Sequence, residues 1–303
     1  MIRAVAAALD AWRDDPAVHA VVIEGAGGRA FCAGGDIRAI RALATEGHHD
    51  EVERFFAEEY ALNQAIASYP KPYVALVDGI CMGGGIGVSV HGAVRVATEA
   101  AVFAMPETGI GLFPDIGATY VLPRLRGAFG TWMALTGARV EGADAAYLGL
   151  ATHFATRERI ATLADELAED GPAVLAGAAV PPPPGALAPL AGQIGRCFGA
   201  GSVAEIIGRL EAEGTDWSRE TLATLRGLSP SSILWTFRIV RDGAGRTLPQ
   251  CLAAELALTR HVTRHPDFRE GVRAMVVDKD RTPRWSPPRI EDVDQAAIAA
   301  MFG

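Results

Sequence analysis

The chain has 303 residues, half of them hydrophobic, and a formal net charge of −8. A chain of this length can bury a large core, which predicts one big domain or a core domain with a smaller one beside it. The acidic balance argues against a nucleic-acid groove and against a membrane surface bound through basic residues, because both need a cationic face.

Cysteine usage and the apolar segments narrow the class further. The four cysteines stand far apart, without a CxxC or Cys/His cluster, so we expect reduced thiols rather than a zinc site or a disulfide framework. The most apolar stretch, residues 73–90, carries Asp78 and many glycines, which suits a packed core better than a bilayer. The scattered cysteines favour a cytoplasmic protein, and the composition, with only two lysines and abundant Ala, Gly and Arg, indicates a GC-rich bacterial genome.

The first half of the chain alternates predicted helices and strands, which is typical of the α/β class. Apolar residues at helical spacing predict helices over residues 1–18, 38–48, 51–68, 116–125, 130–135 and 142–148. A further short helix is expected to open at the glycines of 83–92. Strands are predicted at about 20–24, 73–80, 94–98 and 101–105.

The alternation weakens after residue 169. The stretch "AVPPPPGALAP" (179–189) excludes a regular helix or a central strand and predicts an extended linker or surface loop. Four stretches between residues 202 and 265 then show helical spacing. We therefore expect a core over residues 1–170 and a mostly helical region over 171–303.

Two glycine-rich turns are candidates for binding an anionic or carbonyl oxygen. In "FCAGGDI" (31–37), two glycines let the backbone turn sharply and expose its N–H groups; the alternative is an ordinary turn with Asp36 as a helix cap. In "DGICMGGGIGVSVHG" (78–92), a strand runs through three glycines into a helix, whose first N–H groups are unpaired. This favours an oxyanion hole or a phosphate cradle, with close helix–strand packing as the alternative.

Two carboxylates stand eight residues apart in "FAMPETGIGLFPDIGAT" (103–119). Glu107 follows a proline at the end of an apolar β segment, where burial would raise the pKa of a carboxyl; the alternative is a loop carboxylate paired with an arginine. Asp115 also follows a proline and precedes a helix-like run, so it is either an acid/base group or a helix cap. No GxSxG is present, so no Ser or Cys lies in a nucleophile elbow.

Together these stretches resemble the crotonase, or enoyl-CoA hydratase/isomerase, superfamily, in which an "FCAGGDI" turn, a "GGG" turn and a "PE" follow one another at these spacings. The likeness is closest to the 3-hydroxyisobutyryl-CoA hydrolases, because longer motifs match over nearly the whole chain. The matching segments are residues 31–38, 58–63, 71–92, 95–99, 103–117, 122–125 and 271–285. The resemblance implies a core of ββα repeats wound into a superhelix, with a mostly helical C-terminal region.

The resemblance also implies roles for individual residues. The N–H groups of Gly35 and Gly84 would bind the thioester oxygen, and Glu107 and Asp115 would be the catalytic carboxylates. Substrate contacts are implied at Glu59, Gly34, Asp36 and Gly83. Asp115 would either bind the substrate hydroxyl or handle the proton of the leaving thiol. Coenzyme A phosphates need cations, and the candidates are Arg38, Arg41, Lys71 and Lys279.

One position separates hydrolysis from hydration. Hydratases of the superfamily place a second catalytic glutamate three residues after the middle glycine, and this chain has Gly87 there. The resemblance therefore favours hydrolysis of a short β-hydroxyacyl-CoA, most closely 3-hydroxyisobutyryl-CoA of valine degradation, without a metal or other cofactor. The alternatives are an enoyl-CoA hydratase/isomerase and a non-catalytic acyl-CoA-binding protein.

The start of the chain and its assembly complete the expectations. Family members carry a strand and a further segment before the first helix, whereas this sequence opens on that helix, so N-terminal strands are expected to be missing. Acyl-CoA is the expected partner, and a homo-oligomer is expected because the superfamily commonly forms one.

Overall fold

The computed structural model describes residues 1–303, which divide into two compact units. Unit 1 comprises Met1–Gly34, Glu58–Ala104 and Arg139–Pro189. Unit 2 comprises Gly35–Ala57, Met105–Ala138 and Leu190–Gly303. The predicted boundary after residue 170 cuts the chain once, whereas each of these units gathers three separate segments.

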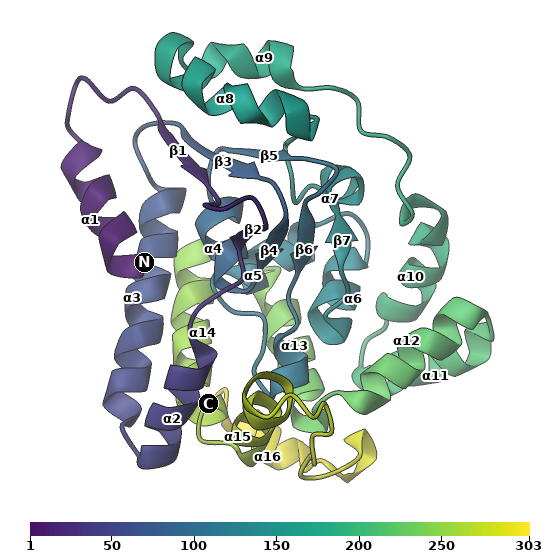
Figure 1. Ribbon diagram of the computed structural model, residues 1–303. Helices are drawn as coiled ribbons and strands as arrows, with labels where there is room; N and C mark the ends of the chain where they lie inside the picture. Colours follow the sequence, from purple (N-terminus) through teal and green to yellow (C-terminus); the bar gives the residue numbers. More distant parts are fainter. The chain divides into compact units, whose positions relative to one another are not determined.

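Unit 1 contains all eight strands, arranged in two four-stranded sheets (Figure 1). One sheet has the order β1-β3-β5-β8 and is parallel throughout. The other has the order β2-β4-β6-β7, with only β7 antiparallel to its neighbour. The strands are β1 (Val21–Glu24), β2 (Ala30–Cys32), β3 (Tyr73–Val77), β4 (Ile80–Met82), β5 (Val94–Ala97), β6 (Val102–Ala104), β7 (Val140–Glu141) and β8 (His153–Phe154).

The first six strands alternate between the two sheets, so that β1, β3 and β5 belong to one and β2, β4 and β6 to the other. Each pair of strands is followed by helical structure, which gives the repeating ββα pattern implied by the resemblance. The single strand predicted over residues 73–80 is wrong, because the chain breaks into β3 and β4 at Asp78 and Gly79. Gly79 has φ +96°, and a Cβ there would lie 2.7 Å from the Arg29 carbonyl oxygen, so the corner requires glycine.

Helices cover the first sheet of unit 1. Apolar side chains of β3 and β5 form a buried cluster with α8 and α9, which Figure 1 draws above this sheet. The sequence reading missed α8, which begins after its cap Thr156. The helices of unit 1 are α1 (Ile2–Trp12), α4 (Gly84–Val90), α7 (Gly142–Leu148), α8 (Arg157–Asp170) and α9 (Leu175–Ala178), with the 3-10 turns η3 (Pro172–Val174) and η4 (Ala188–Leu190). The predicted irregular course of residues 179–187 is confirmed.

Unit 2 is helical, as the spacing after residue 202 predicts. Helix α3 (His49–Ala67) starts in unit 2 and ends in unit 1. The other helices are α2 (Ile37–Glu46), α5 (Ala118–Val121), α6 (Phe129–Thr136), α10 (Ala191–Phe198), α11 (Val203–Glu213), α12 (Asp216–Gly227), α13 (Pro230–Gly243), α14 (Leu248–Val262), α15 (Pro266–Val272) and α16 (Gln295–Ala300), with the short turns η1 (Glu107–Ile110), η2 (Leu122–Arg124), η5 (Arg273–Val277) and η6 (Ile290–Asp292). No helix in the chain has both the length and the apolar character that a membrane crossing needs.

Candidate active site

The two glycine turns meet within unit 1. β2 ends at Cys32, and Gly34 follows with φ +101°, a conformation that favours glycine. A Cβ on Gly34 would lie in ordinary contact, 3.5 Å from the backbone nitrogen of Gly84 at the start of α4. The structure thus places Gly34 of the "FCAGG" turn beside Gly84, the first residue of α4.

Close packing also requires a glycine at Gly85, the second residue of α4. A side chain on Gly85 would collide with the Cys32 carbonyl oxygen, which lies 2.1 Å from the position of its Cβ. Gly83 precedes the helix with φ +51° and ψ −126°. Gly85 therefore serves close helix–strand packing, which was the alternative explanation for the three glycines. It does not compete with a binding role for Gly84, whose half-exposed backbone lies one residue earlier.

Helix α4 is anchored by buried hydroxyl groups. Ser89 Oγ donates to the carbonyl oxygens of Gly85 and Ile86, both at 3.0 Å, and the Tyr73 hydroxyl donates to the Val88 carbonyl oxygen at 3.0 Å. Burial raises the pKa of the neighbouring Cys81 to about 12, so this thiol stays protonated and is no nucleophile at neutral pH. The interior of the helix therefore supplies support rather than a reactive group.

Gly35 and Asp36 lie in unit 2, at the start of α2. Asp36 caps this helix by accepting a hydrogen bond from the Ala39 N–H at 3.2 Å, so the capping alternative is correct for Asp36. A Cβ on Gly35 would lie 2.9 Å from Cζ of the Phe55 ring. A side chain at Gly35 would therefore require the phenyl ring to shift, while the exposed side chain of Asp36 already has a structural partner.

Glu107 begins the short turn η1 in unit 2, and only 6% of its surface is exposed. The turn is closed by hydrogen bonds from the Gly109 N–H to the Pro106 carbonyl and from the Leu112 N–H to the Glu107 carbonyl, both at 3.0 Å. The Thr108 hydroxyl adds a bond of 3.2 Å to the Leu135 carbonyl of α6. The sequence expectation that burial surrounds this carboxylate is confirmed.

The segment after Glu107 is held by α13 and α15. The Leu112 carbonyl oxygen accepts hydrogen bonds from the Ser232 hydroxyl and, at 3.1 Å, from Trp235 Nε1, both on α13. Gly111, at φ +68°, lies so close to α15 that a Cβ would be 2.4 Å from the Asp267 carbonyl oxygen. The backbone that carries Glu107 is therefore fixed on several sides within unit 2.

Asp115 is also buried, with 5% of its surface exposed, and it lies in a tight turn rather than at a helix start. The predicted helix over 116–125 is wrong at its beginning, because Ile116 (φ +57°) and Gly117 (φ +78°) are both left-handed and α5 starts at Ala118. The residue that caps α5 is Gly117. The helix-cap alternative for Asp115 therefore does not describe its position.

A residue that the sequence reading missed holds this turn. Glu255 of α14 accepts hydrogen bonds from the Gly117 N–H (2.8 Å), the Thr119 N–H (3.1 Å) and the Thr119 hydroxyl. It is completely buried. The signal was present in the sequence, because Glu255 interrupts an otherwise apolar or small stripe of α14 at Leu248, Cys251, Leu252, Leu258, Thr259 and Val262.

Glu59 lies on α3 in unit 1, with 6% of its surface exposed. Asn63 follows one turn later on the same side of the helix and is fully buried. Neither polar atom of the Asn63 carboxamide has a hydrogen-bond partner within the chain. The predicted substrate contact at Glu59 is thus accompanied by a second buried polar side chain that the sequence reading did not select.

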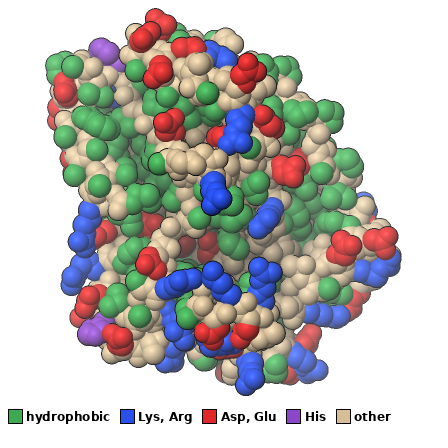
Figure 2. All heavy atoms as spheres, viewed as in Figure 1, with side chains coloured by type: hydrophobic (Ala, Val, Ile, Leu, Met, Phe, Trp, Pro, Cys, Tyr) green, Lys and Arg blue, Asp and Glu red, His purple; other side chains and the backbone are tan.

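The predicted cations separate into two groups. Figure 2 shows Lys and Arg side chains gathered where Figure 1 draws α2 and α15, both in unit 2. Arg38 donates to the Val276 carbonyl at 2.7 Å and Arg41 to the Arg269 carbonyl at 2.8 Å. Lys71, in contrast, lies in unit 1 and donates to the carbonyls of Trp12, the last residue of α1, and of Asp15 just beyond it. Lys71 therefore has a structural task at a helix C-terminus.

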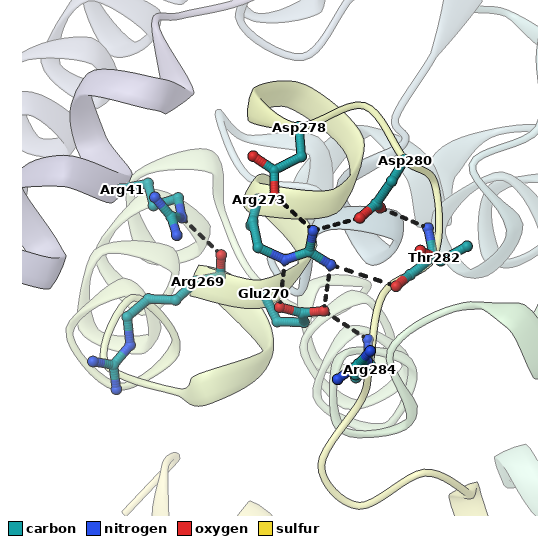
Figure 3. A network of polar contacts seen from close by, with 8 residues as sticks. All are labelled: Arg41, Arg269, Glu270, Arg273, Asp278, Asp280, Thr282 and Arg284. Atoms are coloured by element: carbon teal, nitrogen blue, oxygen red, sulfur yellow. Dashed lines mark hydrogen bonds and ion pairs between the residues drawn. The ribbon is translucent and has the colours of Figure 1, made fainter.

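The C-terminal motif of residues 271–285 forms a polar network around Arg273 (Figure 3). The guanidinium binds Glu270 through two nitrogens, at 2.8 and 2.9 Å, and reaches Asp278 at 2.7 Å and Asp280 at 2.6 Å. Lys279 lies exposed between these two aspartates, with φ +59°. The network shapes the loop that presents Lys279, the fourth predicted cation.

Known proteins resemble the chain along its whole length. A family model described as enoyl-CoA hydratase/isomerase matches residues 1–302. A curated relative, the mitochondrial 3-hydroxyisobutyryl-CoA hydrolase of Mus musculus, is 43% identical over 314 residues, which cover 100% of this chain and 81% of that protein.

Two solved structures are similar as well. A carnitinyl-CoA dehydratase from Mycobacterium thermoresistibile has a TM-score of 0.95 and 39% identity, covering 100% of this chain and 88% of that one. An enoyl-CoA hydratase from Rhodobacter sphaeroides 2.4.1 has a TM-score of 0.93 and 38% identity, covering 100% and 89%. The predicted α/β fold with its ββα core is confirmed by this likeness.

Proposed function

The chain belongs to the enoyl-CoA hydratase/isomerase family, and from this premise we propose that it hydrolyses the thioester of 3-hydroxyisobutyryl-CoA to 3-hydroxyisobutyrate and coenzyme A. The names of its relatives point to more than one reaction, since the curated relative is a hydrolase while the two solved structures are a dehydratase and a hydratase. Which of these reactions the chain catalyses depends on which side chains can activate a water molecule as acid or base.

The observation that carries the proposal is Gly87, buried in α4 where a hydratase would place its second catalytic glutamate. Addition of water across a double bond needs a base for the water and an acid for the carbon, and hydratases of this fold use two carboxylates for this purpose. With glycine at that position, one of the two groups is absent. Buried Asp115 stands in the chain instead, as in the hydrolase pattern.

We assign the stabilisation of the oxyanion that forms during thioester hydrolysis to the backbone N–H groups of Gly35 and Gly84. The contact between Gly34 and the Gly84 nitrogen supports this assignment, because Gly35 follows Gly34 directly in the chain. Preorganised donors of this kind stabilise the charge that develops on the carbonyl oxygen, and removal of one typically costs about 10²–10³ in rate. Gly34, Gly83 and Asp36 shape the turns, and Glu59 contacts the acyl group.

Glu107 delivers the attack in this proposal. Its carboxylate either takes a proton from water, whose oxygen adds to the carbonyl carbon, or adds to that carbon itself and forms an anhydride that water opens. In both routes the carbon–sulfur bond breaks, and water finally supplies the oxygen of the new carboxyl group and the proton of the released coenzyme A thiol. A single turnover in ¹⁸O-labelled water separates the routes, because only the second can leave label in the Glu107 side chain.

Substrate recognition is assigned to Asp115 and the cations of unit 2. A buried carboxylate is a strong hydrogen-bond acceptor, and we assign Asp115 to the β-hydroxyl of the acyl group. Arg38, Arg41 and Lys279 are assigned to coenzyme A phosphates, whereas Lys71 is a weaker candidate because its ammonium already binds two carbonyls. The reaction needs no metal or further cofactor, and a homo-oligomer remains the expected assembly.

The role of Glu107 is tested by thiol release from 3-hydroxyisobutyryl-CoA. Glu107→Gln should lower kcat by at least about a hundredfold, because the amide neither accepts a proton nor attacks a carbonyl. Glu220→Gln, a change at an exposed position of α12, is the matched control and should leave kcat unchanged. Near-normal thiol release by Glu107→Gln would remove Glu107 from the mechanism.

A further inference from the structure

Glu255 is a buried carboxylate to which the mechanism above gives no role. It lies in the middle of α14, on the side of the helix that faces the interior, and has no exposed surface. A buried carboxylate is costly unless hydrogen bonds satisfy it, so its presence in a core stripe calls for a specific partner. That partner is the turn that follows Asp115.

The turn needs external support because its backbone is strained. Ile116 is a β-branched residue at φ +57°, a left-handed conformation that costs about 1–2 kcal/mol for such side chains, and Gly117 continues it at φ +78°. Glu255 Oε2 accepts from the Gly117 N–H, while Oε1 accepts from the N–H and the hydroxyl of Thr119. Three donors on both sides of Ala118 thus converge on one side chain of another helix.

The same carboxylate is close enough to Asp115 for their charges to interact. Burial is the main cause that raises the pKa of Glu255 to about 8, and the charge of Asp115 raises it further, while the three hydrogen bonds lower it. The other titratable group facing Glu255 is Cys251, one turn earlier on α14, whose own surroundings include Arg124 and Arg246. Geometry and charge therefore both connect Glu255 to Asp115.

We propose that Glu255 is a positioning residue for Asp115, which holds the 115–119 turn in its strained form and thereby fixes the carboxylate of Asp115 toward the substrate. The inference deepens the proposed function and rests on it, because Asp115 recognises a β-hydroxyl only if the hydroxyacyl thioester is the substrate. With or without its proton, the carboxyl group of Glu255 can accept a backbone N–H at each of its two oxygens, whereas a carboxamide turns an NH₂ toward one of them.

Kinetics of Glu255→Gln test this role. We expect kcat for 3-hydroxyisobutyryl-CoA to fall about tenfold or more, with little change in KM, because one backbone hydrogen bond of the turn is lost. Thr119→Val keeps the carboxylate, removes one donor and should give a smaller loss in the same direction. It also covers the case in which Glu255→Gln does not fold.

The matched control is Asp144→Asn in unit 1. Asp144 is likewise buried and likewise accepts two backbone N–H bonds, from Ala186 and Leu187, but its loop has no part in the mechanism. This variant should lose stability without losing kcat once folded. Equal kcat losses in Asp144→Asn and Glu255→Gln would overturn the proposal, because both would then report only general destabilisation.

A readout independent of turnover comes from ¹³C NMR titration of the Glu255 carboxyl, assigned by its absence in Glu255→Gln. Asp115→Asn should lower the pKa of Glu255, because it removes a neighbouring negative charge. An unchanged titration would overturn the coupling of the two carboxyls. If the unaltered protein releases no thiol, the proposed function fails; if it is active but Glu255→Gln and Thr119→Val keep full kcat, only the positioning role fails.

Discussion

The titration of the Glu255 carboxyl group beside Asp115 should make the free energy of unfolding of this chain depend on pH. The pKa of Glu255 rises from its ordinary value of 4.5 to about 8 on folding, first because of burial and then because of the Asp115 charge. At pH values between these two pKa values, the Glu255 carboxyl group is protonated in the folded chain and ionised in the unfolded chain. The protonated form of Glu255 is the one that folding favours.

The free energy of unfolding should consequently fall as the pH rises from about 5 to about 8. Below the unfolded pKa both states hold the proton and the contribution is fully present; above the folded pKa it has been lost. The difference is on the order of a few kcal/mol. Urea unfolding at several pH values measures this difference. In Glu255→Gln, the slope of the free energy of unfolding against pH should be shallower by an amount that corresponds to about one proton. Parallel curves for the two proteins would contradict the shift.

Asp115 has a prediction of its own at the residue scale. If this carboxylate accepts a hydrogen bond from the β-hydroxyl, Asp115→Asn should lower kcat/KM for 3-hydroxyisobutyryl-CoA by roughly 10–100-fold. The same change should matter far less for isobutyryl-CoA, which lacks the hydroxyl. Thiol-release kinetics with both substrates are the measurement. Equal losses on the two substrates would instead assign Asp115 to the proton of the leaving thiol.

At the scale of elements, the turn η1 depends on close packing against α15. Gly111 is left-handed and a Cβ there would meet the backbone of Asp267, while Gly271 of α15 lies equally close to Ile110. Two glycines thus let the turn that carries Glu107 lie directly on α15. A side chain at either position must displace backbone, which cannot give way cheaply.

Gly111→Ala should therefore be destabilising by roughly 2 kcal/mol or more, because it combines a left-handed alanine with a backbone collision. Gly127→Ala is the matched control, since Gly127 is also left-handed but a Cβ there meets nothing within 4 Å. The control should cost about 1 kcal/mol. Urea unfolding gives both values, and kcat should fall only for Gly111→Ala. Equal losses of stability in the two variants would show that the backbone of α15 moves aside to accept a side chain at position 111.

At the scale of the whole molecule, much of the architecture could be predicted from the sequence. Helical spacing predicted the helices after residue 202, and Gly142–Leu148 is found as α7 within the predicted bounds. The motifs around Gly84 and Glu107 placed the chain in its family. Local patterns sufficed where each element carries its own periodicity or its own turn residues.

The failures have physical causes that local patterns do not contain. Gly79 divides an apolar run into β3 and β4 because of a close approach to Arg29, which is distant in sequence. Ile116 takes a left-handed conformation because Glu255, 139 positions later, holds the next residues. Short-period patterns describe only nearby residues, so contacts of this range are found from the structure.

Incubation of the protein with 3-hydroxyisobutyryl-CoA and, separately, with crotonyl-CoA is the most direct test of thioester hydrolysis by this chain. Free thiol and acyl-CoA products are followed in both reactions. We predict release of coenzyme A from the first substrate and no hydration of the second, since Gly87 supplies no second carboxylate. Hydration of crotonyl-CoA without thiol release from 3-hydroxyisobutyryl-CoA would contradict this prediction.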